Sequence, residues 1–319
     1  MIRLKQIGTF LAAGYILMFF SEFLFYAEYS PDSGSGLPAL RELGMMWMVY
    51  TGMAWLTLAI LRIFRACSLP AVFLAGAVYG WLLEGVIVTT VYEAIPTQIH
   101  FTAIAWHAPL DVLIGLYLAP QLLRSASPKP MAYLSIALGV FWGFWALWPW
   151  WDTGVPLAVS SFVIFSFTNT ICLILAYWLF AGTSRDNWQP SRLALTLLSG
   201  FLVVLFIFQV IPAYPYALLI LPVLLGTCLL ALWKNRQREL SLKISTESNF
   251  HRSYLLTLFL FPATASSIYA LCVYSGLRMP VTYLVYILSS LIGIGSFAYS
   301  VIHLLKPNRT TPVLAGGSG

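Results

Sequence analysis

Five side chains able to carry a proton or bind a metal ion lie close together in one stretch of an otherwise apolar chain. The stretch is WLLEGVIVTTVYEAIPTQIHFTAIAWHAPLD, residues 81–111, in a sequence with only 9% charged residues. An ionisable side chain at membrane depth costs about 2.5–3.5 kcal/mol or more unless it is paired, hydrated or neutralised. A cluster of such side chains therefore indicates a functional site, and its members are Glu84, Glu93, His100, His107 and Asp111.

The composition indicates the environment in which these residues act. The chain has 319 residues, of which 60% are hydrophobic, and its mean hydropathy is +0.84. Soluble domains are about half apolar and about a quarter charged. The sequence thus predicts an all-α, polytopic integral membrane protein. Its four cysteines form no CxxC pair, which argues against a disulfide framework or a thiolate metal site.

Ten apolar runs are long enough to cross about 30 Å of hydrocarbon at about 1.5 Å per residue. Turn-forming segments such as SPDSGSGLP, SASPKP and TSRDNWQPS separate them. We expect one transmembrane helical domain over residues 1–306, followed by a tail over 307–319 whose closing GGSG is typical of an added linker. The expected helices cover residues 7–28, 43–61, 70–92, 102–123, 131–150, 155–181, 193–211, 214–233, 254–275 and 281–305.

The basic residues predict the orientation of these helices. Of the 17 Lys and Arg residues, all except Arg41 and Arg278 fall on one side of the expected membrane. This bias predicts that both termini are cytoplasmic, in a bacterial-type inner membrane or a plasma membrane. The net charge of +6 then reflects topology and contact with membrane lipids, so no nucleic-acid partner is expected. The sequence carries no signal for the oligomeric state.

The expected helices bring the ionisable residues to one level. Counted from the outer ends of their helices, Glu84 lies ~12 Å deep, His107 ~8 Å, Asp111 ~13 Å and Glu22 ~9 Å. These four residues should therefore share one layer in the outer leaflet. At the mouth above this layer we expect Glu28, Glu93 and His100.

Residue spacing predicts that the side chains face each other. His107 and Asp111 are four residues apart and share one helical face. Gly76, Gly80 and Glu84 also repeat every four residues, and a small-xxx-small stripe is typical of close helix packing in membranes. Glu84 continues this stripe, so it should point into protein rather than lipid.

Three kinds of chemistry fit this set of residues. The first is a divalent metal site, in which an imidazole and carboxylates suit zinc, iron or manganese. The second is a proton-shuttling site that uses Glu84 or Asp111 with His107 as the relay. The third is a structural network of hydrogen bonds between three helices. The ligands expected for the metal site are Glu22, Glu84, His107 and Asp111.

The first functional hypothesis is an intramembrane enzyme, hydrolase-like and metal-assisted, that takes a lipid or another amphiphilic small molecule from the outer leaflet. The metal would activate a bound water, and Glu84 or Glu93 would act as general base. Glu28 and His100 would contact the substrate at the mouth. No HExxH, GxSxG or P-loop motif is present to narrow the reaction. The expected catalytic residues are Glu84, Glu93, His107 and Asp111.

The alternative hypothesis is a proton- or cation-coupled transporter in which Glu84 and Asp111 load and release protons. Transporters usually place such sites near the midplane, between two halves of the protein. The acidic residues here are confined to the first half of the chain and lie off-centre, which favours the enzyme. A subunit of a larger complex is a third possibility.

Overall fold

The computed structural model describes residues 2–25, 40–181, 188–236 and 250–306, and the secondary structure of these residues is entirely helical, with no strand among them. Within these ranges, ten helices are long and apolar enough to cross a membrane. This confirms the predicted all-helical architecture with ten helices of membrane-spanning length. Each expected span has a counterpart, and most boundaries agree within a few residues, as for the span predicted at 43–61 and found at Arg41–Ile63.

Four of the ten spans are single α-helices, and four others contain π-helical turns, which are the elements η1, η2, η4 and η5. The elements η3 and η6 are 3₁₀-helical. In chain order the elements are α1 (Ile2–Met18), η1 (Phe19–Phe23), α2 (Leu40–Ile63), α3 (Leu69–Leu82), η2 (Leu83–Ile87), η3 (Thr90–Tyr92), α4 (Thr97–Thr102), η4 (Ala103–Leu118), α5 (Ala119–Leu122), α6 (Lys129–Trp145), α7 (Trp148–Thr153), α8 (Val159–Ala181), α9 (Arg192–Leu205), η5 (Phe206–Val210), α10 (Ile211–Ala213), α11 (Ala217–Arg236), η6 (Arg252–Phe259), α12 (Leu260–Ser275) and α13 (Val281–Leu305).

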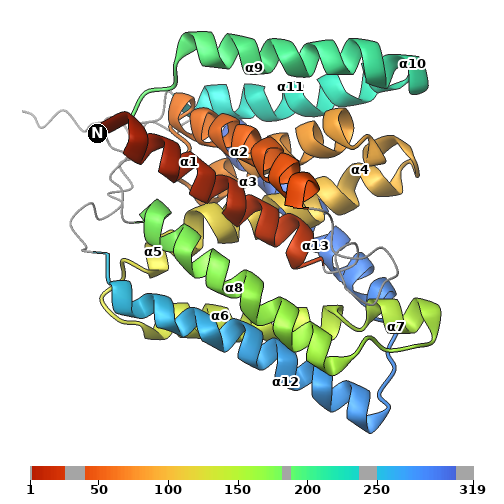
Figure 1. The fold of residues 1–319 in the computed structure, drawn as a ribbon. Helices are drawn as coiled ribbons and strands as arrows, with labels where there is room; N and C mark the ends of the chain where they lie inside the picture. Colours follow the sequence, from red (N-terminus) through yellow and green to blue (C-terminus); the bar gives the residue numbers. More distant parts are fainter. Residues whose placement is uncertain (1, 26–39, 182–187, 237–249, 307–319) are drawn as a thin grey trace, which may run out of the picture.

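The helices form a bundle with three tiers (Figure 1). In that view α9 and α11 lie at the top, α6, α8 and α12 lie at the bottom, and α1, α2 and α3 lie between them. The close pairings include α3 with η4, α1 with α2, α1 with α8, and α6 with α12. The helices that carry the predicted site thus lie in the middle tier.

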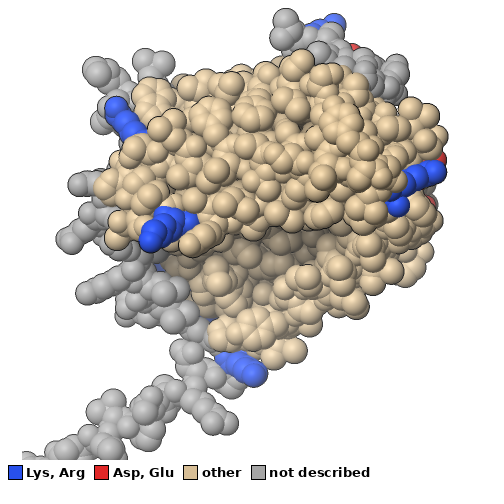
Figure 2. Space-filling model, turned by 90° about the horizontal axis from the view of Figure 1, so that it is seen from below, with Lys and Arg blue, Asp and Glu red and all other residues tan. Residues whose placement is uncertain are grey.

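Burial differs strongly between the tiers. The span Leu69–Ile87, which contains α3, is 78% buried, whereas the span Arg192–Ala213, which contains α9, is 11% buried. Large apolar side chains such as Phe208, Tyr274 and Leu291 are exposed on the outer helices. In Figure 2 the broad middle of the surface carries neither acidic nor basic residues, and the charged residues lie around its edges. This pattern is typical of a surface that faces lipid.

Glycines set the distance between the two helices that form the site. A Cβ atom at Gly76 would lie 2.8 Å from the Cα atom of Ala108, and one at Gly80 would lie 2.8 Å from the Cα atom of Ala103. Only glycine allows backbones to approach so closely. The predicted close-packing stripe is therefore confirmed, and its partner is η4.

The third span ends earlier than the sequence predicted. Its helical turns stop at Ile87 rather than at residue 92, and Thr89 adopts a left-handed conformation with φ of 71° before η3 begins. The physical reason is local, because every residue over 86–91 is β-branched and such side chains disfavour a helix. Because the helix ends at Ile87, the chain turns back and brings Thr90 next to Glu84.

Candidate functional site

The ionisable residues of the predicted layer all lie in π-helical turns. Glu22 is in η1, Glu84 is in η2, and His107 and Asp111 are in η4. Such turns are rare and frequently occur at functional sites, because the extra residue in each turn redirects side chains and disturbs the helical hydrogen bonds. Among the described residues only η5 is a π-helical element outside this site.

His107 lies between two carboxylates. Its Nε2 atom is 2.8 Å from Oε1 of Glu84, and its Nδ1 atom is 2.8 Å from Oδ2 of Asp111. The exposed fractions are 4% for His107, 9% for Glu84 and 0% for Asp111. The three side chains therefore form one buried, contiguous cluster, which joins α3–η2 to η4.

These two contacts fix the number of protons that the cluster must hold. An ionised carboxylate has no hydrogen to donate, so each nitrogen–oxygen contact needs one proton of its own. Either an imidazolium lies between two carboxylates, or a neutral imidazole lies between a carboxylate and a carboxylic acid. In both cases the three groups share protons and together keep one net negative charge.

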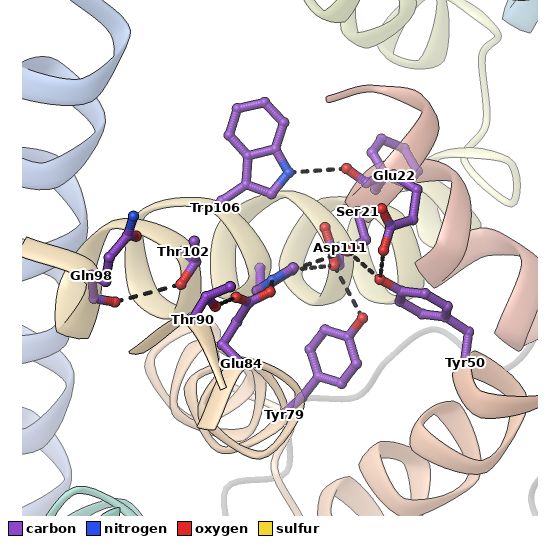
Figure 3. Close-up of polar contacts among 12 residues, drawn as sticks. Ser21, Glu22, Tyr50, Tyr79, Glu84, Thr90, Gln98, Thr102, Trp106 and Asp111 are labelled. Atoms are coloured by element: carbon purple, nitrogen blue, oxygen red, sulfur yellow. Dashed lines mark hydrogen bonds and ion pairs between the residues drawn. The ribbon is translucent and has the colours of Figure 1, made fainter. Parts of the chain in front are cut away.

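Each of the two acids also accepts a hydrogen bond from a hydroxyl group (Figure 3). The Tyr79 hydroxyl donates to Oδ2 of Asp111 over 3.2 Å, and the Thr90 hydroxyl donates to Oε2 of Glu84. The second oxygen of Asp111, Oδ1, is buried without a hydrogen-bond partner among the described residues. The acid at the inner end of the cluster therefore keeps one free acceptor.

A second arm of hydrogen bonds leads from His107 to the first helix. The Ser21 hydroxyl oxygen is 3.4 Å from Nδ1 of His107 and 2.6 Å from the Tyr50 hydroxyl oxygen, and Tyr50 donates to Glu22. Figure 3 shows Thr90 and Glu84 to the left of Asp111, and the second arm to its right. The predicted convergence of Glu22 with the other three residues is thus indirect, through two hydroxyl groups.

The four residues expected to bind a metal do not converge on one point. Glu84 and Asp111 bond to opposite edges of the His107 ring, so one ion bound to either nitrogen could not also reach the carboxylate at the other. Within the described part of the chain, no group of three or more His, Cys, Asp and Glu side chains is arranged to hold a metal ion. The metal site stays a prediction, and its ligand set does not fit this arrangement of side chains.

Of the residues expected at the mouth, the structure describes Glu93 and His100, and neither is hydrogen-bonded to the cluster in the described part of the chain. Glu93 is exposed directly after η3. The ring of His100 lies 6.1 Å from that of Tyr286 on α13, and its Nδ1 atom is buried without a partner among the described residues. Glu28 lies outside the described residues, so its predicted role stays untested.

Four hydroxyl-bearing residues of the site were not found from the sequence. Tyr79 could have been, because it lies three residues after Gly76 and therefore on the stripe that leads to Glu84. Ser21, Tyr50 and Thr90 carry no such signal, since only the folded chain brings them to the acids. The contacts of Ser21 and Tyr50 are long-range and follow from helix packing, whereas Thr90 reaches Glu84, six residues earlier, because the chain turns back after η2.

Comparisons with protein-family models, with curated proteins and with solved structures find no match to this chain. The chemistry of the site is therefore argued from its own geometry.

Proposed function

We propose that this chain is a proton-coupled membrane transporter whose proton-binding site is Glu84, His107 and Asp111. The observation that carries the proposal is the position of the buried imidazole, with both ring nitrogens hydrogen-bonded to carboxylates. A histidine held in this way presents no free nitrogen to a substrate. It is suited to exchanging protons between the two acids.

The burial of the cluster supports this role. Intramembrane acids and histidines commonly form proton relays in pumps and transporters. Glu84 is the least buried member, and its partner Thr90 lies in the turn after η2. Asp111 is fully buried and has one unpartnered oxygen. Protons enter at Glu84, pass through the ring of His107 and are stored at Asp111.

The backbone of the site also suits a transporter. Transporters bind their ions on discontinuous or distorted helices, which change shape as access alternates. All the acidic members of the site lie in π-helical turns, and η4 contains Pro109, which has no N–H group to close a helical bond. The positive-inside bias predicts that both termini are cytoplasmic, which would put the site in the outer half of the membrane.

Charge movement after a pH jump tests the proposal without a known substrate. Purified protein is reconstituted in liposomes, adsorbed on a solid-supported membrane and exposed to a sudden pH step. Binding of protons inside the membrane produces a transient current, which we expect for the wild type and not for Glu84→Gln or His107→Gln. The matched control is Glu42→Gln, because Glu42 is an exposed acid on α2 and its variant should keep the current.

The opposite result would be equally clear. A wild-type current no larger than that of empty liposomes, in protein shown to be folded, contradicts a proton-binding site in the membrane field. An equal current in Glu84→Gln would place proton binding elsewhere.

A metal-assisted intramembrane enzyme acting on a lipid or another amphiphile is the second candidate. One observation favours it, which is that every acid of the cluster comes from the first four spans rather than from an interface between two halves. Elemental analysis of wild type, His107→Ala and Glu84→Ala decides between the two. Stoichiometric zinc, iron or manganese that is lost in both variants supports the enzyme.

A further inference from the structure

We propose that the indole N–H groups of Trp106 and Trp145 are positioning groups, which hold the end of the first helix so that Ser21 and Glu22 stay in register with His107 and Tyr50. The inference rests on the proposed function and adds residues outside the hydrogen-bonded cluster. It is based on the hydrogen-bond donors to the last carbonyl groups of the first helix.

The end of a helix leaves carbonyl groups without a partner inside the helix, and water is scarce at membrane depth. The first helix ends in η1, where Leu24 donates to Phe19 in π register. Two carbonyl groups of this end receive indole donors instead. Trp106 donates to the carbonyl oxygen of Phe20 over 3.0 Å, and Trp145 donates to that of Phe25 over 2.9 Å.

The first of these bonds fixes the register between the first helix and η4. Trp106 directly precedes His107, and Phe20 directly precedes Ser21. The bond from Trp106 to Phe20 therefore lies beside the contact between Ser21 and His107, which measures 3.4 Å. A shift by one residue along either helix would separate both pairs together.

Ring contacts hold the two indoles in place. The ring of Phe25 lies 5.0 Å from that of Trp106 and 5.2 Å from that of Trp145, and the two indole rings lie 5.3 Å apart. Trp106 and Trp145 are both buried. The group thus links the first helix, η4 and α6 at the level of the site.

The chain offers a matched control for an experiment. Trp142 is also fully buried in the aromatic core, but its indole nitrogen has no hydrogen-bond partner among the described residues. At each of the three positions, tryptophan is replaced by its benzothienyl isostere, which keeps the shape and removes the N–H donor. Hydrogen–deuterium exchange of residues 19–25 and the pH-jump current are then measured.

We expect the replacement at 106 to speed exchange over residues 19–25 about tenfold, because a bond that protects this turn is lost. The replacement at 145 should speed it less, because the Phe25 carbonyl also accepts a longer bond of 3.4 Å from Trp148. The same two replacements should slow the pH-jump current, while replacement at 142 should leave both readings at wild-type values. Trp106→Phe, which also removes the donor, should behave like the isostere.

Three results would overturn the inference, and they are distinguishable. If the variants at 106 and 145 give the same exchange rates and current as the variant at 142, the indole donors do not position the end of the first helix. Faster exchange with an unchanged current shows that they hold the helix end but do not serve the site. A wild-type protein without any current overturns the proposed function itself, and the positioning role with it.

Discussion

Both ring nitrogens of His107 are hydrogen-bonded to acids, so a substitution of this residue should lower the stability of the fold strongly. Each of its ring nitrogens bonds one carboxylate, and Asp111 Oδ2 also accepts the Tyr79 hydroxyl. A buried polar network of this kind stabilises the fold while it is complete. Removal of one member destabilises the fold, because the remaining buried groups lose a hydrogen-bond partner and cannot replace it with water.

This argument predicts strong coupling between His107 and Asp111. His107→Leu leaves two acids buried without a shared donor, and Asp111→Leu leaves the Tyr79 hydroxyl without an acceptor and Nδ1 with only its 3.4 Å contact to Ser21. We expect each change to lower the free energy of unfolding by about 3–5 kcal/mol. We expect the double variant to cost less than the sum by about 0.5–3 kcal/mol.

Unfolding of the purified variants in mixed detergent micelles measures this cycle. Glu42→Leu provides the control, since Glu42 is exposed on α2 and its change should add independently to Asp111→Leu. Strict additivity of His107→Leu and Asp111→Leu would mean that the two side chains do not act as one unit.

At the scale of helices, hydropathy was enough to place the spans but not their internal turns. The span expected at 102–123 is found at Thr97–Leu122, because length and apolar composition decide which segments can cross a membrane. The π register of η4 was not predictable, since it depends on packing against Gly76 and Gly80 as well as on Pro109. The depths of Glu84 and His107 could be counted along the chain, whereas the hydroxyl partners could not.

Close packing of α3 against η4 gives a prediction about glycine. In Gly80→Ala the new Cβ would lie 2.8 Å from both the Cα and the O atoms of Ala103, and backbone atoms cannot yield as a flexible side chain can. Overpacking of this kind typically costs about 1–3 kcal/mol, so the apparent melting temperature should fall. Gly226→Ala in α11 meets nothing within 4 Å and should be neutral or stabilising, since alanine favours a helix by up to about 1 kcal/mol. Equal melting temperatures for the two variants would contradict the packing argument.

The distortion of η4 predicts a separation of stability from function. In a π register the donor for the carbonyl of Ile104 would be residue 109, and proline has no N–H group to offer. Pro109→Ala supplies a donor and favours a regular α-helix, which rotates His107 relative to Asp111. The melting temperature should hold or rise, while the pH-jump current should fall.

Pro222→Ala is the matched control for this change, because Pro222 also lies inside a helix, α11, and is exposed there. Its variant should gain stability in the same way and keep the full current. If Pro109→Ala also keeps the full current, the distortion of η4 has no part in proton binding.

At the scale of the whole molecule, the site lies off-centre in a lopsided bundle. The helices that carry it are well buried, whereas α9 and α13 expose most of their length to the surroundings. The side of the membrane from which protons reach Glu84 therefore depends on how the whole bundle is oriented. The bias of Lys and Arg predicts that the loop between α2 and α3 is cytoplasmic and that α7 ends outside.

The native Cys67 makes this orientation measurable. It lies between α2 and α3, whereas Cys228 and Cys272 are buried and Cys172 is exposed on α8, within a candidate membrane span. Burial raises the pKa of the Cys67 thiol above its usual value, and nearby Arg62 offsets this only in part. The reactive thiolate is therefore scarce at neutral pH, and labelling by a maleimide should be slow and should speed up as the pH is raised.

In right-side-out vesicles, a membrane-impermeant maleimide should label Cys67 only after permeabilisation. Asp152→Cys, an exposed position on α7, should be labelled directly. The reverse pattern would contradict the positive-inside orientation. It would also place Glu84 and Thr90 in the cytoplasmic half of the membrane, so that a transporter built on this cluster would load its protons from the cytoplasm rather than from outside.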